Sequence, residues 1–458
     1  MATTTHALVR EYEKWSPRSA EIMARGKVVF PGGDTRASAH FSPYPLVMAR
    51  GEGCRIYDVD GHEFLDFMNN FTSLVHGHAH PATVKAVTEQ LPLGSAFAAP
   101  SRTQIELAEL IVSRVPSIEQ MRFCSSGSEG TLMALRCSRA YTGRQKIMKM
   151  EGGYHGSYEL AEVSLVPTPN ARGDISHPNS LAVDKSFPDS VLEDTVICPY
   201  NQPDLARALI REHANELAAV IVEPILGSMG MVSASTEFLQ ALRDETSRHG
   251  IVLIFDEVIS LRLSNGGDQS RHGVTPDITC MGKIIGGGLP VGGIGGSREL
   301  MAVFDPDAKE TVMHASTFSG NALTMAAGLA TMSDYQEEDS QRINVLGEKL
   351  RNGFNGILNQ HGIKAQAIGS GSLSNIIFSR NDLQSSRDTM SGMIAGGHIG
   401  ALLHLGMLRH GVVSASRLMY CVSTPMGEGE IDQAVTALNE ALSELRPYIE
   451  AERPNLLG

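Results

Sequence analysis

Short apolar runs alternate with amphipathic stretches over most of the chain beyond about residue 100. Residues 218–222 and 251–255 are uninterrupted apolar runs of the length and branching typical of strands buried on both faces. Between them, residues 236–249 have the pattern of a helix, which Gly250 closes. These three elements predict a βαβ unit and therefore an α/β fold with a mostly parallel sheet.

The same pattern predicts further elements on both sides of this unit. The first 30 residues resemble one leading helix, which Pro31-Gly32-Gly33 ends, and a small antiparallel sheet follows over residues 46–66. The C-terminal part is expected to be α/β. Further strands are predicted over residues 120–124, 146–150, 277–281, 374–378, 412–414 and 418–422, and further helices over 104–114, 322–335 and 338–358.

A carboxylate and a lysine follow two of the predicted strands. Asp256 comes directly after residues 251–255, and Lys283 comes shortly after residues 277–281. Ligands of open parallel sheets bind outside the carboxyl ends of the strands, so both side chains can meet over one ligand. Pyridoxal phosphate needs this pair, because a lysine amine forms a Schiff base with its aldehyde and a carboxylate keeps its pyridine nitrogen protonated. An isolated Asp and Lys are more often surface groups, so other parts of a site must decide.

A small-residue turn follows the strand predicted over residues 120–124. Ser125-Ser126-Gly127-Ser128-Glu129-Gly130 leads into a helix, and Ser126 and Glu129 have the spacing of a capping box. Backbone N–H groups and the positive end of the helix dipole suit a phosphate dianion, although an ordinary capped helix has the same pattern. Later, Gly153-Tyr154-His155-Gly156 leaves room for a flat ligand, and Glu223 ends the strand beside Asp256.

The composition excludes several classes of partner. The net charge of −13 argues against a nucleic-acid or anionic-membrane partner, and no run of 18 apolar residues predicts a membrane span. His76, His78 and His80 alternate, but no carboxylate or cysteine completes a metal site there. We expect a cytoplasmic protein with reduced thiols, because its cysteines form no Cys-x-x-Cys pair; they are Cys54, Cys124, Cys137, Cys198, Cys280 and Cys421.

Taken together, these pieces resemble the class III (ω-type) aminotransferases of the fold-type I pyridoxal-phosphate enzymes. The order and spacing of the motifs agree with that family over about residues 30 to 440. The matching motifs are Ser126-Gly127-Ser128-Glu129, Gly153-Tyr154-His155-Gly156, Glu223-Pro224, Asp256-Glu257-Val258, Gly282-Lys283 and Thr317-Phe318 with Gly320-Asn321.

The resemblance implies a large domain with a mostly parallel seven-stranded sheet between helices and a smaller α+β domain built from both termini. Its boundaries would be residues 1–75 for the N-terminal part of the small domain, 76–335 for the large domain and 336–458 for the C-terminal small domain. It also implies a homodimer with shared active sites.

Roles for individual residues follow from the same resemblance. Lys283 would form the Schiff base and shuttle the proton, and Asp256 would pair with the pyridine nitrogen. The other expected cofactor contacts are Ser126, Gly127 and Ser128 at the phosphate, Val258 and Tyr154 on the two ring faces, Glu223 near the ring hydroxyl, and Thr317 at the phosphate of the neighbouring subunit's cofactor.

Within the family, the chain departs from the usual pattern at Gly130 and Ala322, where Ala and Pro are common. Pro31-Gly32-Gly33 with Arg36 resembles both the glutamate-1-semialdehyde aminomutases and the β-amino-acid aminotransferases. The sequence after Asp256 lacks the Gly-Phe-Arg of the aminomutases. Moreover, Ser414-Ala415-Ser416-Arg417 resembles the β-amino-acid enzymes, in which a late arginine helps to seat a carboxylate.

The predicted activity is therefore transfer of an amino group between a β- or aromatic amino acid and a 2-oxo acid such as 2-oxoglutarate or pyruvate. Arg36 and Arg417 are the expected carboxylate partners of these small molecules. Two alternatives stay open at this point. One is an aminomutase that moves the amino group within one molecule, and the other is a catalytically silent relative with a binding or structural role.

Overall fold

The computed structural model describes residues 6–458, and the chain divides into two compact units. The first unit comprises Met1–His80, Arg342–Asp382 and Ser391–Gly458, and the second comprises Pro81–Gln341 and Leu383–Met390. The chain therefore passes from the first compact unit to the second after His80 and returns to the first after Gln341. The domain boundaries drawn from the sequence, after residues 75 and 335, stay a prediction.

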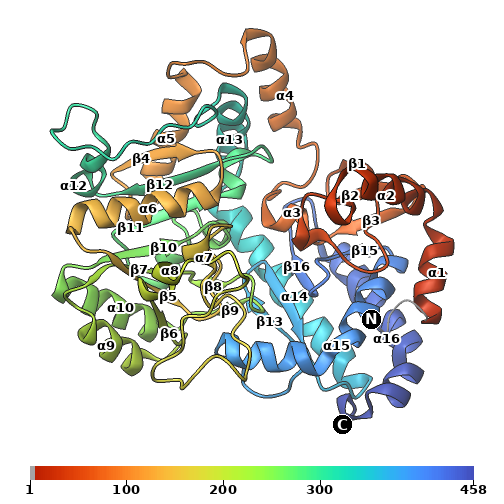
Figure 1. The fold of residues 1–458 in the computed structure, drawn as a ribbon. Helices are drawn as coiled ribbons and strands as arrows, with labels where there is room; N and C mark the ends of the chain where they lie inside the picture. Colours follow the sequence, from red (N-terminus) through yellow and green to blue (C-terminus); the bar gives the residue numbers. More distant parts are fainter. Residues whose placement is uncertain (1–5) are drawn as a thin grey trace. The chain divides into compact units, whose positions relative to one another are not determined.

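A seven-stranded sheet forms the centre of the second unit (Figure 1). Its strands lie in the order β4-β12-β11-β10-β7-β5-β6. Strand β12 runs antiparallel to β11 and β4, whereas the pairs from β11 to β6 are parallel. The predicted mostly parallel seven-stranded sheet is confirmed. The strands are β4 (Gln120–Cys124), β5 (Lys146–Met150), β6 (Thr195–Cys198), β7 (Leu217–Val222), β10 (Val252–Asp256), β11 (Ile278–Gly282) and β12 (Gly292–Gly296).

Helices bury both faces of this sheet. On β10, Leu253 and Phe255 are as buried as Val252 and Ile254, which explains why the strand is apolar at every position. Helix α6 packs against β7, β10, β11 and β12, and α10 packs against β7 and β10. The helices of this unit include α4 (Pro81–Gln90), α5 (Arg102–Arg114), α6 (Gly127–Thr142), α9 (Pro203–Glu212), α10 (Thr236–His249) and α13 (Ala322–Asp334), and the shorter α7 (Glu159–Glu162), α8 (Asp189–Glu193), α11 (Asp268–His272) and α12 (Arg298–Met301).

One face of the sheet shares its core with α6. Ile221 of β7, Ile254 of β10 and Cys280 of β11 belong to the same buried cluster as residues of that helix. Because side chains alternate between the faces of a strand, Glu223 and Asp256 follow on this same face, two positions further along. The sheet thus directs both carboxylates to one side of its carboxyl edge.

The first unit contains a four-stranded sheet, β1-β2-β3-β15, and a three-stranded sheet, β13-β14-β16. Strand β15, from the C-terminal part, pairs in parallel with β3, from the N-terminal part. The strands are β1 (Met48–Glu52), β2 (Arg55–Asp58), β3 (Glu63–Asp66), β13 (Gln366–Ser370), β14 (Leu373–Ile377), β15 (Val412–Val413) and β16 (Met419–Cys421). The helices include α1 (Ala7–Trp15), α2 (Pro17–Val29), the four-residue α3 (Asn69–Thr72) and α16 (Glu428–Glu452), with parts of α14 (Glu337–Gln360) and α15 (Ser386–Arg409).

The single leading helix predicted over residues 1–30 is wrong, because two helices occupy this segment. Helix α1 ends at Trp15, and Pro17 opens α2 after Ser16, whose φ of −121° and ψ of 53° are not helical. Proline has no N–H group and disfavours helical geometry in the residue before it, so the break falls here. Residues 1–5 of that prediction lie outside the described residues.

Within residues 6–458, α15 is long and apolar enough to cross a membrane. Its most apolar window is 56% buried inside the protein, as in the core helix of a globular protein, which meets the same criteria. Gly397 also interrupts the helix, with a φ of 50° and a ψ of −130°. This helix is therefore weak support for a membrane span.

Candidate active site

Four charged side chains of the second unit stand at the carboxyl ends of adjacent strands. Lys149 lies on β5, Glu223 follows β7, Asp256 ends β10, and Lys283 follows β11. Lys149 and Ile254 both pair with residue 221 of β7, so Glu223 and Asp256 lie at one level, two residues further on. Lys149, Glu223 and Asp256 are buried, whereas Lys283 is partly exposed.

Hydrogen bonds from two loops fix the carboxylate of Asp256. Its Oδ2 lies 2.9 Å from Nδ1 of His155, and its Oδ1 accepts a bond of 3.1 Å from the backbone N–H of Val258. Burial lowers the pKa of His155, although Asp256 opposes this shift. A neutral imidazole that donates Nδ1–H to Asp256 follows, with the buried Nε2 lacking a hydrogen-bond partner among the described residues. Sequence reasoning quoted His155 in its motif but missed this contact.

The carboxylate of Glu223 accepts two backbone hydrogen bonds. Oε2 accepts from the N–H of Tyr154 at 2.9 Å, and Oε1 accepts from the N–H of Gly227 at 3.1 Å. Burial and the charge of Asp256 raise the pKa of Glu223 to about 8, although both N–H donors and the charge of Lys283 favour its ionised form. Two carboxylates of adjacent strands therefore lie within electrostatic reach of each other and of Lys283.

Residues 125–129 at the start of α6, called the phosphate turn after their predicted role, present hydrogen-bond donors. Ser126 is the N-cap and accepts a hydrogen bond of 3.1 Å from the N–H of Glu129, as its spacing predicted. The first N–H groups of this helix, at Gly127 and Ser128, have no partner within the helix, because the helix begins there. Ser128 Oγ accepts a bond of 3.3 Å from the N–H of Ser157. Backbone donors and the helix dipole together attract a dianion.

Glycines allow this turn to approach the ends of β10 and β11 closely. A Cβ atom added to Gly127 would lie 3.0 Å from a methyl group of Val258, and one added to Gly282 would lie 3.4 Å from the other methyl group. At Gly156, whose φ is 117°, the added atom would lie 2.5 Å from Ser128 Oγ. The phosphate turn and the residue before Lys283 therefore converge on Val258, which lies two residues after Asp256.

Lys283 occupies a strained turn immediately after β11. Its φ of 50° lies in the left-handed region that residues other than glycine rarely adopt. It opens a short 3₁₀ helix, η6 (Lys283–Gly286), before the turn at Gly287 and Gly288. Strained backbone of this kind clusters at functional sites, where the surroundings hold it in place.

The loop after β5 is anchored by the short segment from α15 that belongs to this unit. Arg387 forms a bidentate pair with Glu151, with Nε–Oε2 and Nη2–Oε1 distances of 2.7 and 3.0 Å. A Cβ added to Gly152 would lie 2.4 Å from the Cβ of Ser386, so the backbones nearly touch. Sequence reasoning missed this contact, because a separation of more than 230 residues leaves no local pattern.

The segment before Thr317 is hydrogen-bonded to the phosphate turn. His314 Nε2 lies 2.9 Å from Oε1 of Glu129, and Ser316 Oγ lies 3.0 Å from Ser125 Oγ. Although burial opposes ionisation, hydrogen bonds from the Ser125 N–H and from His314 lower the pKa of Glu129 below its usual range. Thr317 itself is exposed. The phosphate turn and the segment of Thr317 are therefore one connected structure.

Arg36 and Arg417 lie in the first unit, where both approach the same short segment. Arg36 Nη1 donates a hydrogen bond of 2.8 Å to Oδ1 of Asn70, and the guanidinium of Arg417 lies 5.5 Å from the ring centre of Phe71. Asn70 and Phe71 have φ values of 46° and 54°, so this segment is a left-handed turn. We call Arg36, Arg417 and the turn Asn69–Thr72 the arginine pair site.

The three alternating histidines have local partners. His78 Nε2 lies 2.7 Å from Oδ2 of Asp66, and His76 Nδ1 lies 2.8 Å from Oγ1 of Thr424. His76 and His80 stack with ring centres 4.4 Å apart. Over residues 6–458, the structure contains no group of three or more His, Cys, Asp or Glu side chains that could hold a metal ion.

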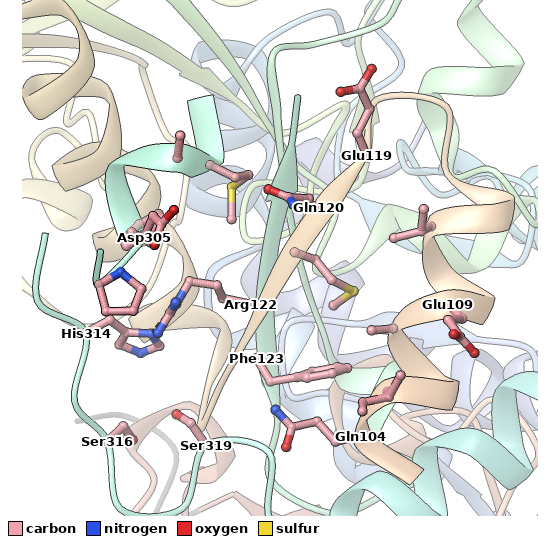
Figure 2. A pocket seen from close by; sticks show the side chains of 18 residues that line it. Gln104, Glu109, Glu119, Gln120, Arg122, Phe123, Asp305, His314, Ser316 and Ser319 are labelled. Atoms are coloured by element: carbon pink, nitrogen blue, oxygen red, sulfur yellow. Dashed lines mark hydrogen bonds between the residues drawn. The ribbon is translucent and has the colours of Figure 1, made fainter. Parts of the chain in front are cut away.

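A groove of about 850 Å³ lies away from the strand ends, along the edge strand β4 (Figure 2). Its walls come from α5, β4 and the chain between α12 and Ser319. Figure 2 shows Gln104 and Glu109 of α5 on one side of β4, and Arg122 and His314 on the other. Because it is open and holds none of the strand-end residues, this groove is a surface feature distinct from the site around Asp256.

Comparisons with known proteins agree with this geometry. The model of the family "Aminotransferase class-III" matches residues 37–412. A glutamate-1-semialdehyde 2,1-aminomutase of Methanopyrus kandleri is 36% identical over 95% of this chain and 99% of its own. A β-phenylalanine transaminase of Variovorax paradoxus is 36% identical over 92% of this chain and 91% of its own. The crystal structure of an ω-transaminase from Sphaerobacter thermophilus superposes with a TM-score of 0.89 at 43% identity, over 93% of this chain and 98% of its own.

The fold and the strand-end site define a fold-type I pyridoxal-phosphate enzyme. The chain belongs to the class-III aminotransferases, as its sequence motifs predicted. It is a pyridoxal-phosphate-dependent transaminase. A solved transaminase with this cofactor bound is 35% identical to the chain, with a TM-score of 0.86 over 94% of this chain and 99% of its own.

The residues of the second unit fit that cofactor. The phosphate turn offers backbone donors and a hydroxyl, the buried Asp256 offers an acceptor for a protonated nitrogen, and Lys283 offers an amine. Gly127, Gly156 and Gly282 leave the space that larger side chains would fill. Every part of the donor set is therefore present in one unit, except the contribution expected from a neighbouring subunit.

Proposed function

We propose that this transaminase moves an amino group between a carboxylate-bearing amine, a β- or aromatic amino acid, and a 2-oxo acid. The observation that carries the proposal is the arginine pair site, where two guanidinium groups gather at one left-handed turn. Guanidinium pairs bidentately with carboxylates, so two such groups suit a pair of acidic substrates. The Variovorax relative, named a β-phenylalanine transaminase, supports this substrate class.

In this proposal the second unit holds the cofactor. Ser126, Gly127 and Ser128 bind its phosphate at the start of α6. Val258 and Tyr154 would enclose its ring, and Glu223 would lie near the ring hydroxyl. Bound in this way, pyridoxal phosphate supplies an electron sink for the substrate carbon that bears nitrogen.

The remaining steps belong to the side chains at the strand ends. Lys283 would hold the cofactor through its Nζ, and this amine would also be the base that takes a proton from the substrate carbon bearing nitrogen. Asp256 would face the pyridine nitrogen, and His155 holds that carboxyl group in place through Nδ1–H. Arg36 and Arg417 divide the two acids, so that one seats the amino donor and the other helps to admit the 2-oxo acid.

Half-reactions with single amines test this function directly. The purified holoenzyme is mixed with a β-amino acid, an aromatic α-amino acid or a matched amine without carboxylate, and the cofactor's absorbance change is followed. We expect conversion with the acids at least about tenfold faster than with the matched amine. Equal rates for acids and amine would remove carboxylate recognition from the proposal.

A second candidate, intramolecular amino transfer, is favoured by the Methanopyrus relative, named an aminomutase. A transaminase needs a 2-oxo acid to regain its starting form and therefore follows ping-pong kinetics. An aminomutase turns over repeatedly with one substrate alone. Repeated turnover of glutamate-1-semialdehyde without any 2-oxo acid would support the second candidate over the first.

We also propose that the enzyme acts as a homodimer in which Thr317 reaches the phosphate of the neighbouring subunit's cofactor. Exposed apolar side chains lie on the two segments that line the groove along β4, which suits burial against a second copy. They include Ile105, Phe318 and Met313, which are 54%, 61% and 75% exposed. Burial of such a patch is the usual function of a large exposed apolar surface.

Complementation between two inactive chains tests this arrangement. Lys283→Ala and Thr317→Ala are coexpressed with different tags, and the mixed dimer is isolated. One of its two sites then combines an intact Lys283 with an intact Thr317, so it regains about half of the wild-type activity. Activity no higher than that of the Thr317→Ala homodimer would show that Thr317 acts within its own subunit.

The proposed compartment is the cytoplasm. All six cysteines are free and buried, which suits a reducing environment. Fractionation of cells that express the chain without a tag would test this proposal.

A further inference from the structure

Lys149 is a buried cation, and none of the chemical roles described above involves it. It lies on β5, is 1% exposed and points to the same face of the sheet as Glu223 and Asp256. Removing an ammonium group from water costs several kcal/mol unless the site compensates it. A lysine retained at such a position therefore indicates a specific task.

Its partners lie on the loop after its own strand. Nζ donates hydrogen bonds to the carbonyl oxygens of Gly153 at 2.9 Å and Val163 at 2.5 Å. The N–H of Gly152 in turn donates to the carbonyl of Ser164 at 2.9 Å. Lys149 thus connects the segment directly after β5, at Gly153, with the segment after α7, at Val163.

The loop carries one residue expected at the cofactor ring and one that supports Asp256. Tyr154 follows Gly153 directly, and His155 holds Asp256. A Cβ at Gly153 would lie 3.1 Å from Nε2 of His155, so the imidazole lies close to the backbone that Lys149 binds. A displacement of Gly153 would therefore move both side chains together.

We propose that Lys149 is a positioning residue of the transamination site, whose ammonium group holds the Gly152–Gly156 loop so that Tyr154 and His155 keep their places. The inference rests on the proposed roles of Tyr154 and Asp256. It goes beyond them because Lys149 itself touches neither substrate nor cofactor.

The charges that face Lys149 come from several elements. Burial lowers the pKa of Lys149 to about 7, and the carboxylates of Glu223, Glu162 and Glu151 oppose this shift. The charge of Lys149 in turn contributes to lowering the pKa of His155. Removing the ammonium group should therefore raise the pKa of His155. Because entry of water into the site would act in the same direction, amide exchange of the loop and kcat are measured beside it.

Two substitutions separate the charge from the hydrogen bonds. Lys149→Met keeps the length of the side chain and loses both, whereas Lys149→Gln keeps two N–H donors and loses the charge. Lys146→Met is the matched control, because Lys146 lies on the same strand and pairs instead with Glu216 at 2.8 Å. The holoenzymes are compared by kinetics, and the apoproteins by amide hydrogen exchange and by NMR titration of His155.

For Lys149→Met we expect amide exchange of residues 152–156 to accelerate at least about tenfold and kcat to fall about tenfold or more, with KM changed less than about twofold. Lys149→Gln should lie between this variant and the wild type. Both should raise the titration pH of His155, and Lys146→Met should change none of these values.

Wild-type exchange in the loop and an unchanged His155 titration in Lys149→Met would overturn the proposal. A mobile loop with unchanged kcat would instead leave the positioning intact and contradict the proposed roles of Tyr154 and Asp256. If Lys149→Met does not fold, the same measurements on Lys149→Gln decide whether the proposal holds. If neither folds, exchange in the wild-type apoprotein decides, because amides of 152–156 that exchange much faster than those of β5 would contradict a held loop.

Discussion

The strand-end site and the arginine pair site hold their charged groups in opposite ways. Asp256 and Glu223 are buried, and each accepts two hydrogen bonds from fixed neighbours. Arg36 is exposed, and Arg417 approaches an aromatic ring on a loop. Groups that handle protons and electrons need one geometry, whereas groups that select substrates must admit two different acids in turn. The contrast suggests that chemistry is fixed by the sheet and selectivity is carried by loops.

The largest effect should come from the strand-end site. Lys283→Ala removes the amine that links to the cofactor, so turnover should fall below about 1% of the wild-type rate. Thermal unfolding should show an intact fold, since Lys283 is partly exposed. The exposed Lys185→Ala serves as the control. Retention of a larger fraction of activity would remove Lys283 from its proposed role.

Asp256→Asn should have the next largest effect. The amide is similar in shape but carries no charge, so it cannot stabilise a protonated pyridine nitrogen. We expect cofactor to remain bound while the single-turnover rate of proton removal falls about a hundredfold. Stopped-flow absorbance measures this rate, and a normal value would contradict the assignment of Asp256.

The strand-end site was largely predictable from the sequence, because its residues follow short apolar runs directly. Asp256 and Lys283 are next to their strands, so alternation and strand order bring them together without knowledge of the packing. Ser126 was predictable from its spacing to Glu129, and the hydrogen bond between Ser126 and the Glu129 backbone is present in the structure.

The supporting contacts were not predictable in the same way. The contact of His155 with Asp256 spans 101 residues, and that of Arg387 with Glu151 spans 236. No local pattern records such a separation, since only the folded sheet brings the partners together. Lys149 was hidden for another reason: its strand contains two lysines, and the sequence does not distinguish the buried Lys149 from the partly exposed Lys146.

The arginine pair site should respond more selectively. Arg36→Ala and Arg417→Ala should each lose about 1.5–3 kcal/mol, or more than about tenfold in kcat/KM, for one carboxylate-bearing substrate. A matched amine without carboxylate should lose little. Steady-state kinetics with both donors and with a 2-oxo acid makes the comparison. Equal losses for acid and amine would mean that the arginine supports the fold of the turn at Asn70.

The last comparison concerns a different quantity, the stability of the protein without cofactor. The pKa of Glu223 is about 8 in the folded protein, against an ordinary value near 4.5. Between these two pH values the folded state keeps a proton that the unfolded state has lost. The free energy of unfolding therefore falls as pH rises through this window, by up to about 1.4 kcal/mol per pH unit from this group.

Glu223→Gln should remove this slope, because glutamine does not titrate. Urea unfolding of the apoprotein is measured between about pH 5 and pH 9. The free energy of unfolding of the variant should increase relative to that of the wild type as pH rises, with no further change above about pH 8. Glu193→Gln, at an exposed position on α8, should instead run parallel to the wild type. Parallel curves for Glu223→Gln and the wild type would show that Glu223 is ionised in the folded protein. The buried site would then tolerate two adjacent carboxylate charges, and the contrast with the exposed arginine pair site would rest on geometry alone.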